Sequence, residues 1–367
     1  MTTRWFRTWL LLSTLFSVVA IPVLADQPLA SDAPLASSVA SFLAKESDEG
    51  SVEGRGWIPY AGVEATFLAP QFGTGSGDTV VINDLNTPAT YLASGSDANL
   101  SYLGLAPRFW IGSANESGNG IRGRYWQLNQ SSTVGNPFNP VLFPGDLSGN
   151  SASNIFRVYA ADLEGTKAFC WNNWDLMASF GVRHASVAQQ SAVSATGLVP
   201  VAGGSDLLYG TASSGSQFNG TGLTFGIQGV QPICENCCGS FGLYASARGS
   251  VLWGTAATSA STSATIIGPG LQNVAVDGAN GRGDEELYIA EFQIGGQWTR
   301  PLKCCNSVAF ARLTAEYQWW DVSGSGRSAA TSPVFRAAND DITATANGIN
   351  LSSLDFIGFG IATGFYW

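Results

Sequence analysis

The sequence is short of charge, of histidine and of long apolar runs. Only 12% of its 367 residues are charged, and His184 is the single histidine. Serine–histidine catalysis away from His184 is therefore excluded. The formal net charge of −10 makes nucleic acid a poor partner. After the N-terminus, no apolar stretch approaches the roughly 20 residues that a membrane-spanning helix needs.

Glycine and aromatic residues are abundant instead. The chain has 44 glycines, and 11% of its residues are aromatic. Helix formers are scarce outside the N-terminus, so the composition predicts strands and turns. The length is compatible with two or three soluble domains or with one large all-β unit.

The first 25 residues have the pattern of a secretory signal peptide. Arg4 and Arg7 precede an apolar run at 9–20, and small residues before Asp26 form a cleavage site. A membrane anchor is the alternative, but the apolar run is too short. Cleavage leaves 15 basic and 27 acidic residues, a net charge of 15 − 27 = −12. Residues 26–56, rich in small and acidic residues, are predicted to be a flexible periplasmic segment.

From residue 57 to 367, apolar and polar residues alternate in ten segments. In one of them Leu313, Tyr317 and other apolar residues share a face, while Arg312 and Glu316 share the opposite face. Such alternation over about ten residues is typical of strands that cross a membrane in a barrel. The segments are 57–69, 100–112, 120–129, 155–167, 174–187, 218–231, 241–253, 287–299, 308–320 and 353–367.

The connections between these segments alternate between long and short. The long loops are expected at 70–99, 130–154, 188–217, 254–286 and 321–352, and the short turns at 113–119, 168–173, 232–240 and 300–307. This rhythm predicts an all-β, transmembrane, antiparallel up-and-down β-barrel of about 10 strands (8–12), with short periplasmic turns and long external loops in the bacterial outer membrane. A secreted β-sandwich is the alternative, since it has the same alternation.

The last segment, "FIGFGIATGFYW", has one apolar face and one face of small residues. Its apolar face resembles the C-terminal signal that the barrel-assembly machinery recognises, with Phe359, Ile361, Phe365 and Trp367 as signal residues. That face is expected to contact outer-membrane lipid, and pairing with the first segment removes the strand edge.

Eleven charged residues of these segments fall on the face opposite the lipid. Because a charge facing mid-bilayer lipid costs about 2–4 kcal/mol, we assign them to the lumen. The predicted lumen residues are Glu64, Arg108, Arg122, Arg124, Asp162, Glu164, Arg183, Arg248, Glu291, Arg312 and Glu316. They form either a water-filled passage for small ions or solutes, or an interior tied shut by arginine–carboxylate pairs.

The same segments contain short motifs that resemble a known family. The motifs are "RGRYWQLN" (122–129), "DLEG" (162–165), "GVRHA" (181–185), "FNGTGLTFGIQG" (218–229), "ASARGS" (245–250) and "AEYQWWDV" (315–322). They are similar to strand motifs of the Legionella-type major outer-membrane-protein family, which is described as pore-forming. Leu223 stands where the family pattern has a proline. The resemblance implies a porin-like barrel and identifies no solute.

Three other motifs of the sequence point to different functions. His184, Ser186 and Asn219 resemble the His-x-Ser plus Asn set of outer-membrane phospholipases, which would make the chain a lipid-face ester hydrolase. The Asn-Gly that should follow the serine is missing. A dinucleotide-binding spacing at 118–123 is followed by no helix pattern. Scattered aspartates of the long loops could bind Ca²⁺, but solvated surface charge is the better interpretation.

All six cysteines are expected in the short turns. Cys170 lies in one turn, Cys234, Cys237 and Cys238 in the next, and Cys304 and Cys305 in the third. In an oxidising periplasm this clustering favours disulfides between turns, with 15 possible connectivities, over a zinc site.

The sequence thus predicts a porin-like barrel that is not an enzyme and has no metal or cofactor. A structural or adhesive surface barrel with acidic loops, and the ester hydrolase, are the alternatives.

Overall fold

The computed structural model describes the chain from residue 56 to 366, apart from short connecting segments. The residues outside the description within that range are 73–77, 85–89, 95–97, 99, 137–148, 202–203, 237–238, 269–270, 303–306, 324–329, 332–333, 337–339 and 348–352. The predicted signal peptide, almost all of the N-terminal segment and Trp367 also lie outside it. Among the described residues, no helix is both long and apolar enough to cross a membrane.

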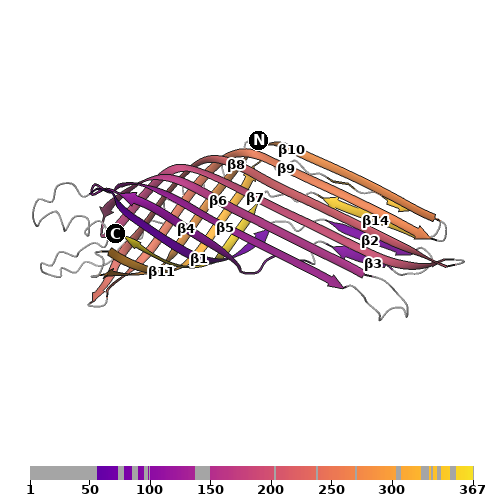
Figure 1. Ribbon diagram of the computed structural model, residues 1–367, viewed down its shortest axis with the longest axis horizontal. Helices are drawn as coiled ribbons and strands as arrows, with labels where there is room; N and C mark the ends of the chain where they lie inside the picture. Colours follow the sequence, from indigo (N-terminus) through magenta and orange to yellow (C-terminus); the bar gives the residue numbers. More distant parts are fainter. Residues whose placement is uncertain are drawn as a thin grey trace, which may run out of the picture. The chain divides into compact units, whose positions relative to one another are not determined.

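Ten antiparallel strands close into a barrel (Figure 1), which confirms the predicted fold. These strands are β1 (Ile58–Phe72), β4 (Gly104–Ala114), β5 (Asn119–Asn136), β6 (Gly149–Trp171), β7 (Trp174–Val201), β8 (Gly204–Asn236), β9 (Gly239–Gly268), β10 (Leu271–Leu302), β11 (Ser307–Ser323) and β15 (Leu354–Tyr366). Each strand pairs with its neighbour along the barrel, and β1 pairs with β15 from Tyr60↔Tyr366 to Phe72↔Leu354. No barrel strand is therefore left as an edge over its membrane-crossing part.

Short turns join the strands at one end of the barrel, here named the short-turn end. The β6–β7 turn consists of Asn172 and Asn173, which both have positive φ, as a tight two-residue hairpin requires. The β4–β5 turn is closed by the Gly118 amide, which donates to the Asn115 carbonyl oxygen at 2.8 Å. Both ends of the barrel domain also lie here, since Tyr60 pairs with Tyr366.

The long loops predicted at the opposite end are wrong at two places. The described residues of 188–217 and 254–286 are all strand, because β7, β8, β9 and β10 run for 28, 33, 30 and 32 residues. A tilted strand needs only about 9–11 residues to cross a bilayer. The residues here are mostly alanine, serine, threonine and glycine, as in "SSGS" and "TSASTSAT", so the hydrophobic contrast between the two faces is weak. These projecting parts are named the hairpin extension.

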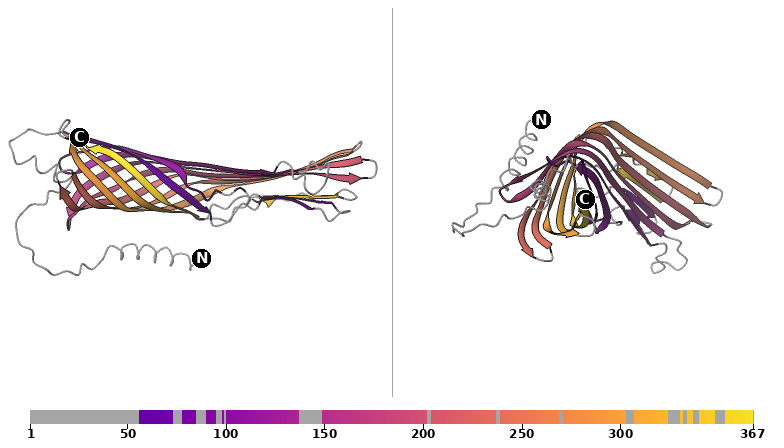
Figure 2. Two further views of the ribbon diagram at one scale, coloured as in Figure 1. Left: turned by 90° about the horizontal axis from the view of Figure 1, so that it is seen from below. Right: turned by 60° about the vertical axis from the view of Figure 1, so that its left-hand side comes forward.

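The other long connections contain a small second sheet. Its strands are β2 (Thr79–Asp84), β3 (Thr90–Ser94), β12 (Ala330–Thr331), β13 (Val334–Arg336) and β14 (Asp340–Asn347). Pairing of β2 with β14 joins the β1–β4 connection to the β11–β15 connection. Figure 2 shows this sheet beside the hairpin extension, against which it packs.

A second apolar core lies between the two sheets. Val80 and Ala344 of the small sheet join Val193, Leu208, Ile266 and several alanines in one buried cluster. Asp78 is buried at its margin and accepts a hydrogen bond from Ser214 Oγ at 2.7 Å. The part of the chain that projects beyond the barrel is therefore a packed two-layer structure and not a set of separate loops.

The outward face of the barrel carries a band of exposed apolar side chains. Each of the ten barrel strands contributes at least one such residue. They include Val63, Leu105, Phe109, Ile111, Ile121, Leu163, Phe180, Val182, Leu223, Phe225, Trp253, Ile294, Trp298, Leu313, Ile357 and Ile361. Apolar area on this scale marks a membrane-contacting surface. The signal residues Phe359, Ile361 and Phe365 belong to this band, and Phe359 stacks on Phe67 across the β1–β15 seam with ring centroids 5.0 Å apart.

The predicted cysteine arrangement is only partly described. Cys170 lies in β6 and Cys234 in β8, at strand ends near the short turns and not within the turns. The Cys170 thiol donates a hydrogen bond to Asp175 Oδ1 at 3.5 Å, and Cys234 is an exposed thiol. Cys237, Cys238, Cys304 and Cys305 lie outside the described residues, so the disulfides stay a prediction.

Two outward-facing residues of β10 give a test of where the lipid ends. Ile294 is 58% exposed on the barrel and Val276 is 74% exposed on the extension. We expect Ile294→Arg to destabilise the barrel by about 2–4 kcal/mol, because the charge faces hydrocarbon, and Val276→Arg to be nearly neutral. Urea unfolding in lipid vesicles measures both. Equal effects of the two substitutions would contradict the membrane boundary.

Candidate functional site in the barrel lumen

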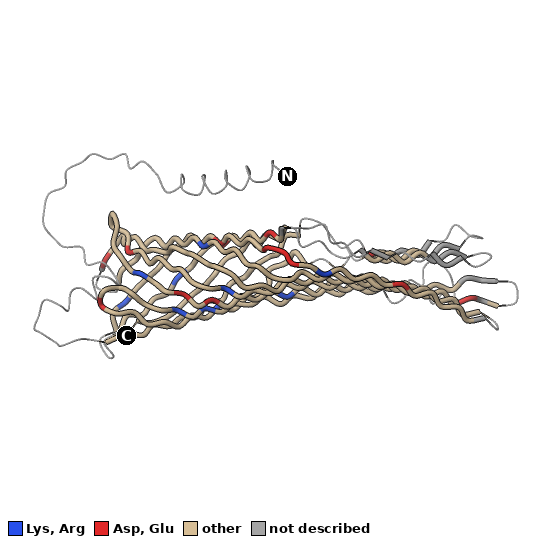
Figure 3. The backbone as a smooth tube through the Cα atoms, turned by 90° about the horizontal axis from the view of Figure 1, so that it is seen from above, with Lys and Arg blue, Asp and Glu red and all other residues tan. Residues whose placement is uncertain are grey.

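The eleven predicted lumen residues all lie on the inward face of the barrel. Arg124 is the most accessible, with 11% of its side chain exposed, and the others are buried. Figure 3 shows the acidic and basic positions interspersed along the barrel strands. Cross-strand register explains the assembly, because Glu64 lies opposite Arg108, Arg122 opposite Glu164, Asp162 opposite Arg183 and Arg248 opposite Glu291.

Arg108 of β4 holds two carboxylates, one from the adjacent strand β1 and one from β11. Its guanidinium donates to Glu64 Oε2 at 2.9 Å and to Glu316 Oε1 at 2.6 Å. Gln293 Nε2 joins the same two carboxylates, at 3.0 Å from Glu64 and 2.8 Å from Glu316. Four strands are cross-linked through this group of charges.

Arg183 is fully buried and binds two further carboxylates. It donates to Asp162 from Nε and Nη2, at 2.6 and 2.9 Å, and to Glu291 from Nη1 at 2.5 Å. Glu291 also accepts from Arg124 Nη2 at 3.4 Å. The fork geometry of Arg183 fixes both carboxylates in orientation as well as in charge.

Glu164 is shared by two arginines. Arg122 donates to Glu164 Oε2 from Nη2 at 2.8 Å, and its Nη1 donates to Gln228 Oε1 at 3.0 Å. Arg248 also pairs with Glu164, and its Nη1 lies 3.7 Å from Asp162 Oδ2. Since Arg248 lies between Glu164 and Asp162, it connects the Arg122 group to the Arg183 group. These charged residues, without Arg312, are named the ion-pair lattice.

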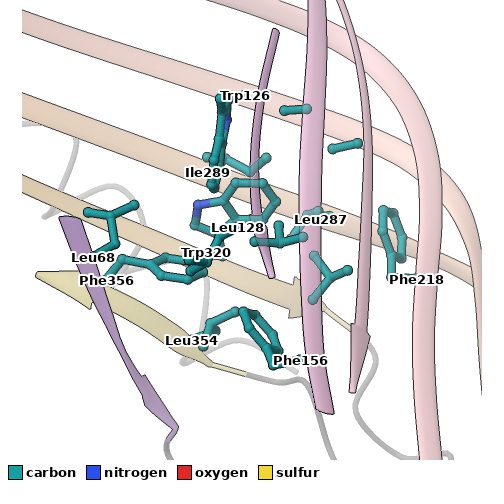
Figure 4. Packing of buried hydrophobic residues seen from close by; sticks show 14 of the residues in the cluster. Leu68, Trp126, Leu128, Phe156, Phe218, Leu287, Ile289, Trp320, Leu354 and Phe356 are labelled. Atoms are coloured by element: carbon teal, nitrogen blue, oxygen red, sulfur yellow. The ribbon is translucent and has the colours of Figure 1, made fainter. Parts of the chain in front are cut away.

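An apolar plug fills the lumen on the side of the lattice away from the short-turn end. Figure 4 shows the large side chains converging there, with Trp126, Trp320 and Phe356 among them. Trp126 and Trp320 pack edge to face with ring centroids 5.7 Å apart, and both are nearly fully buried. The plug consists of Leu68, Leu100, Ala106, Trp126, Leu128, Phe156, Val158, Ala160, Ala185, Val187, Phe218, Leu252, Leu287, Ile289, Trp320, Val322, Leu354 and Phe356.

Hydrogen bonds connect the plug to the lattice. Trp320 Nε1 donates to Gln318 Oε1 at 3.0 Å, and Gln318 Nε2 donates to Glu316 Oε1 at 2.6 Å. Sequence reasoning stopped at the charged residues and missed the plug. The signal was present, because Leu68, Trp126 and Trp320 continue the inward parity of Glu64, Arg124 and Glu316.

The phospholipase-like residues do not form a catalytic arrangement. Both ring nitrogens of His184 are occupied, Nδ1 by Thr221 Oγ1 at 2.9 Å and Nε2 by the Tyr159 hydroxyl at 3.3 Å. Ser186 is buried and lies opposite Asn219 in register, but it makes no hydrogen bond to His184. In the part of the chain that the structure describes, no group of His, Cys, Asp and Glu residues could hold a metal ion.

Comparisons with known proteins give only distant structural likeness. No family model and no curated protein matches the chain. Among solved structures, the outer-membrane protease OmpT from Escherichia coli is 11% identical, covers 86% of this chain and 99% of its own, and has a TM-score of 0.35. A Pseudomonas aeruginosa FadL homologue is 9% identical (84% and 90% covered, TM-score 0.21). The P. putida toluene transporter TodX is 8% identical (89% and 91% covered, TM-score 0.21). With TM-scores this low, none of these likenesses bears on the site.

Removing Arg183 tests the lattice. Arg183→Met leaves Asp162 and Glu291 short of their closest cation in a buried site, so we expect the free energy of unfolding to fall by about 3–5 kcal/mol. Arg157→Met is the matched control, because Arg157 is exposed on β6 and takes no part in the lattice. Urea unfolding in vesicles gives both values. Similar small losses for the two variants would contradict a coupled lattice.

Proposed function

We propose that the chain is an outer-membrane barrel with a closed lumen that displays a two-layer β-structure at the cell surface, in a structural or adhesive role. The observation that carries this is the filled lumen. The ion-pair lattice and the apolar plug lie one above the other across the barrel, and their members are almost all buried. Passage of a solute through the lumen would need both the lattice and the plug to open. The hairpin extension lies beyond the apolar band and is accessible without such a change.

The apolar band and the short-turn end support the proposed placement in the outer membrane. An even number of strands places both barrel termini in the compartment of the short turns, which for an exported barrel is the periplasm. The hairpin extension and the small sheet then face the outside. The proposal also includes export by the signal peptide, insertion by the barrel-assembly machinery and contact with outer-membrane lipid.

The porin-like function predicted from the sequence stays a prediction, and the geometry favours the structural alternative. The resemblance to the Legionella-type family supports a shared barrel architecture, and its pore-forming description does not account for the plug. The ester hydrolase has the least support, because His184 is engaged by Thr221 and Tyr159 and not by Ser186.

Conductance in planar bilayers tests the closed lumen. We expect the refolded wild-type barrel to give no stable unitary current, because about two layers of side chains separate the two ends of the lumen. A general porin inserted under the same conditions serves as the positive control. Reproducible current steps from the wild-type barrel would restore the porin-like interpretation and refute the proposal.

Shortening the hairpins tests the role of the external part. The register pairs Ala192↔Ser213 and Ser261↔Gly278 allow each hairpin to be closed early with an Asn-Gly turn. We expect the barrel to remain folded, as judged by heat-modifiable migration, and cell attachment or autoaggregation to be lost. Val276→Ser, which keeps both sheets, is the control. Attachment unchanged by the shortening would show that the extension is not the functional part.

A further inference from the structure

Arg312 differs from every other arginine of the lumen. The lumen contains six arginines and five carboxylates, and each carboxylate has an arginine partner within 4.0 Å, whereas Arg312 has none in the described part of the chain. Arg312 is 8% exposed, and its Nε has no hydrogen-bond partner. A buried guanidinium without an anion is costly.

Aromatic rings hold Arg312 in place without neutralising it. The guanidinium carbon lies 3.7 Å from the centre of the Tyr244 ring and 5.2 Å from that of Phe310. Such cation–π contacts orient a guanidinium over the ring face but leave its in-plane N–H groups free to donate. Arg312 is therefore positioned and still able to bind an anion.

A cavity lies beside Arg312 on the short-turn side of the lattice. Its volume is about 30 Å³, and it is lined by four of the six lumen arginines, Arg108, Arg122, Arg124 and Arg312, but by Glu64 alone of the carboxylates. Tyr60, Tyr244 and Tyr366 add hydroxyl groups to the wall. Since the other three arginines are paired within the lattice, the charge of Arg312 gives the cavity a net positive potential.

We propose that this cavity binds one small inorganic anion of halide size, with chloride as the natural ligand. A single water needs about 10–15 Å³, so the cavity has room for about two waters or one halide, and not for a phosphate or a sugar. The bound anion supplies the charge that Arg312 lacks and makes the lumen neutral. It acts as a structural counterion of the closed barrel, which is a property beyond the proposed surface role.

Bromide is the probe that tests the site in the wild-type protein. Crystals of the refolded barrel grown or soaked in sodium bromide should show an anomalous peak in the cavity, next to Arg312. A cavity without a bromide peak overturns the proposal. This measurement needs no variant, so it holds even if a substitution prevents folding.

Thermal unfolding supplies the test in solution. At constant ionic strength, replacing sodium gluconate by sodium bromide should raise the unfolding midpoint of the wild type by a few degrees, with saturation, because only the folded barrel has the site. Arg312→Gln should show no such rise and should be at least as stable as the wild type in gluconate, since it removes the unpaired charge.

Two controls make the outcome specific. Arg157→Gln removes an exposed arginine and should keep the full bromide response, and Arg312→Lys should keep a response that needs more bromide. An equal bromide response in wild type and Arg312→Gln, or its loss in Arg157→Gln, shows a general salt effect and overturns the proposal.

Discussion

The pairing of β1 with β15 is the constraint on which the rest of the structure depends. Lipid offers no partner for a backbone amide, so the sheet has to close, and closure gives every strand residue only two directions, inward or outward. A ring of ten strands is narrow, so inward side chains from facing strands meet across it. Arg108 of β4 illustrates this. Besides Glu64 of the adjacent strand β1, it reaches Glu316 of β11, from which β1 and β15 separate it.

The two halves of the lumen are filled by different kinds of side chain. Next to the short-turn end, arginines and carboxylates meet at ion-pair distance, and amide side chains such as Gln293 satisfy the remaining oxygens. Beyond them the inward side chains are mainly apolar, and Gln318 is the link through its bonds to Glu316 and Trp320. The rigid interior suits a barrel whose strands are up to 33 residues long and project beyond the lipid band.

The alternation of inward and outward side chains made most of the barrel strands predictable from the sequence. The hairpin extension was not predicted, because the hydrophobic difference between its two faces is small. Strict alternation around Arg312 and Glu316 gave the strand and both of its faces, since charge cannot face lipid. Trp126 and Trp320 share the inward parity of Arg124 and Glu316. An apolar side chain by itself does not indicate its face, because lipid and an apolar lumen are both suitable environments. The extension was missed because a run of alanine, serine and threonine looks like a polar loop. The pairing of β2 with β14 could not be predicted, because it joins segments more than 250 residues apart.

The buried charges answer a question that the plug leaves open, namely what fixes the register of the strands. A shift by one residue turns every inward side chain toward the lipid. For Leu68, Phe156 or Phe356 that shift exchanges one apolar environment for another and is weakly opposed. For each lattice charge the shift costs about 2–4 kcal/mol at mid-bilayer depth, and the loss of its partner adds to this. Summed over charges that occur on eight of the ten barrel strands, the penalty exceeds the stability of an ordinary domain. The lattice therefore selects one register for a barrel whose plug alone would tolerate another, and this selection does not require the lumen to conduct.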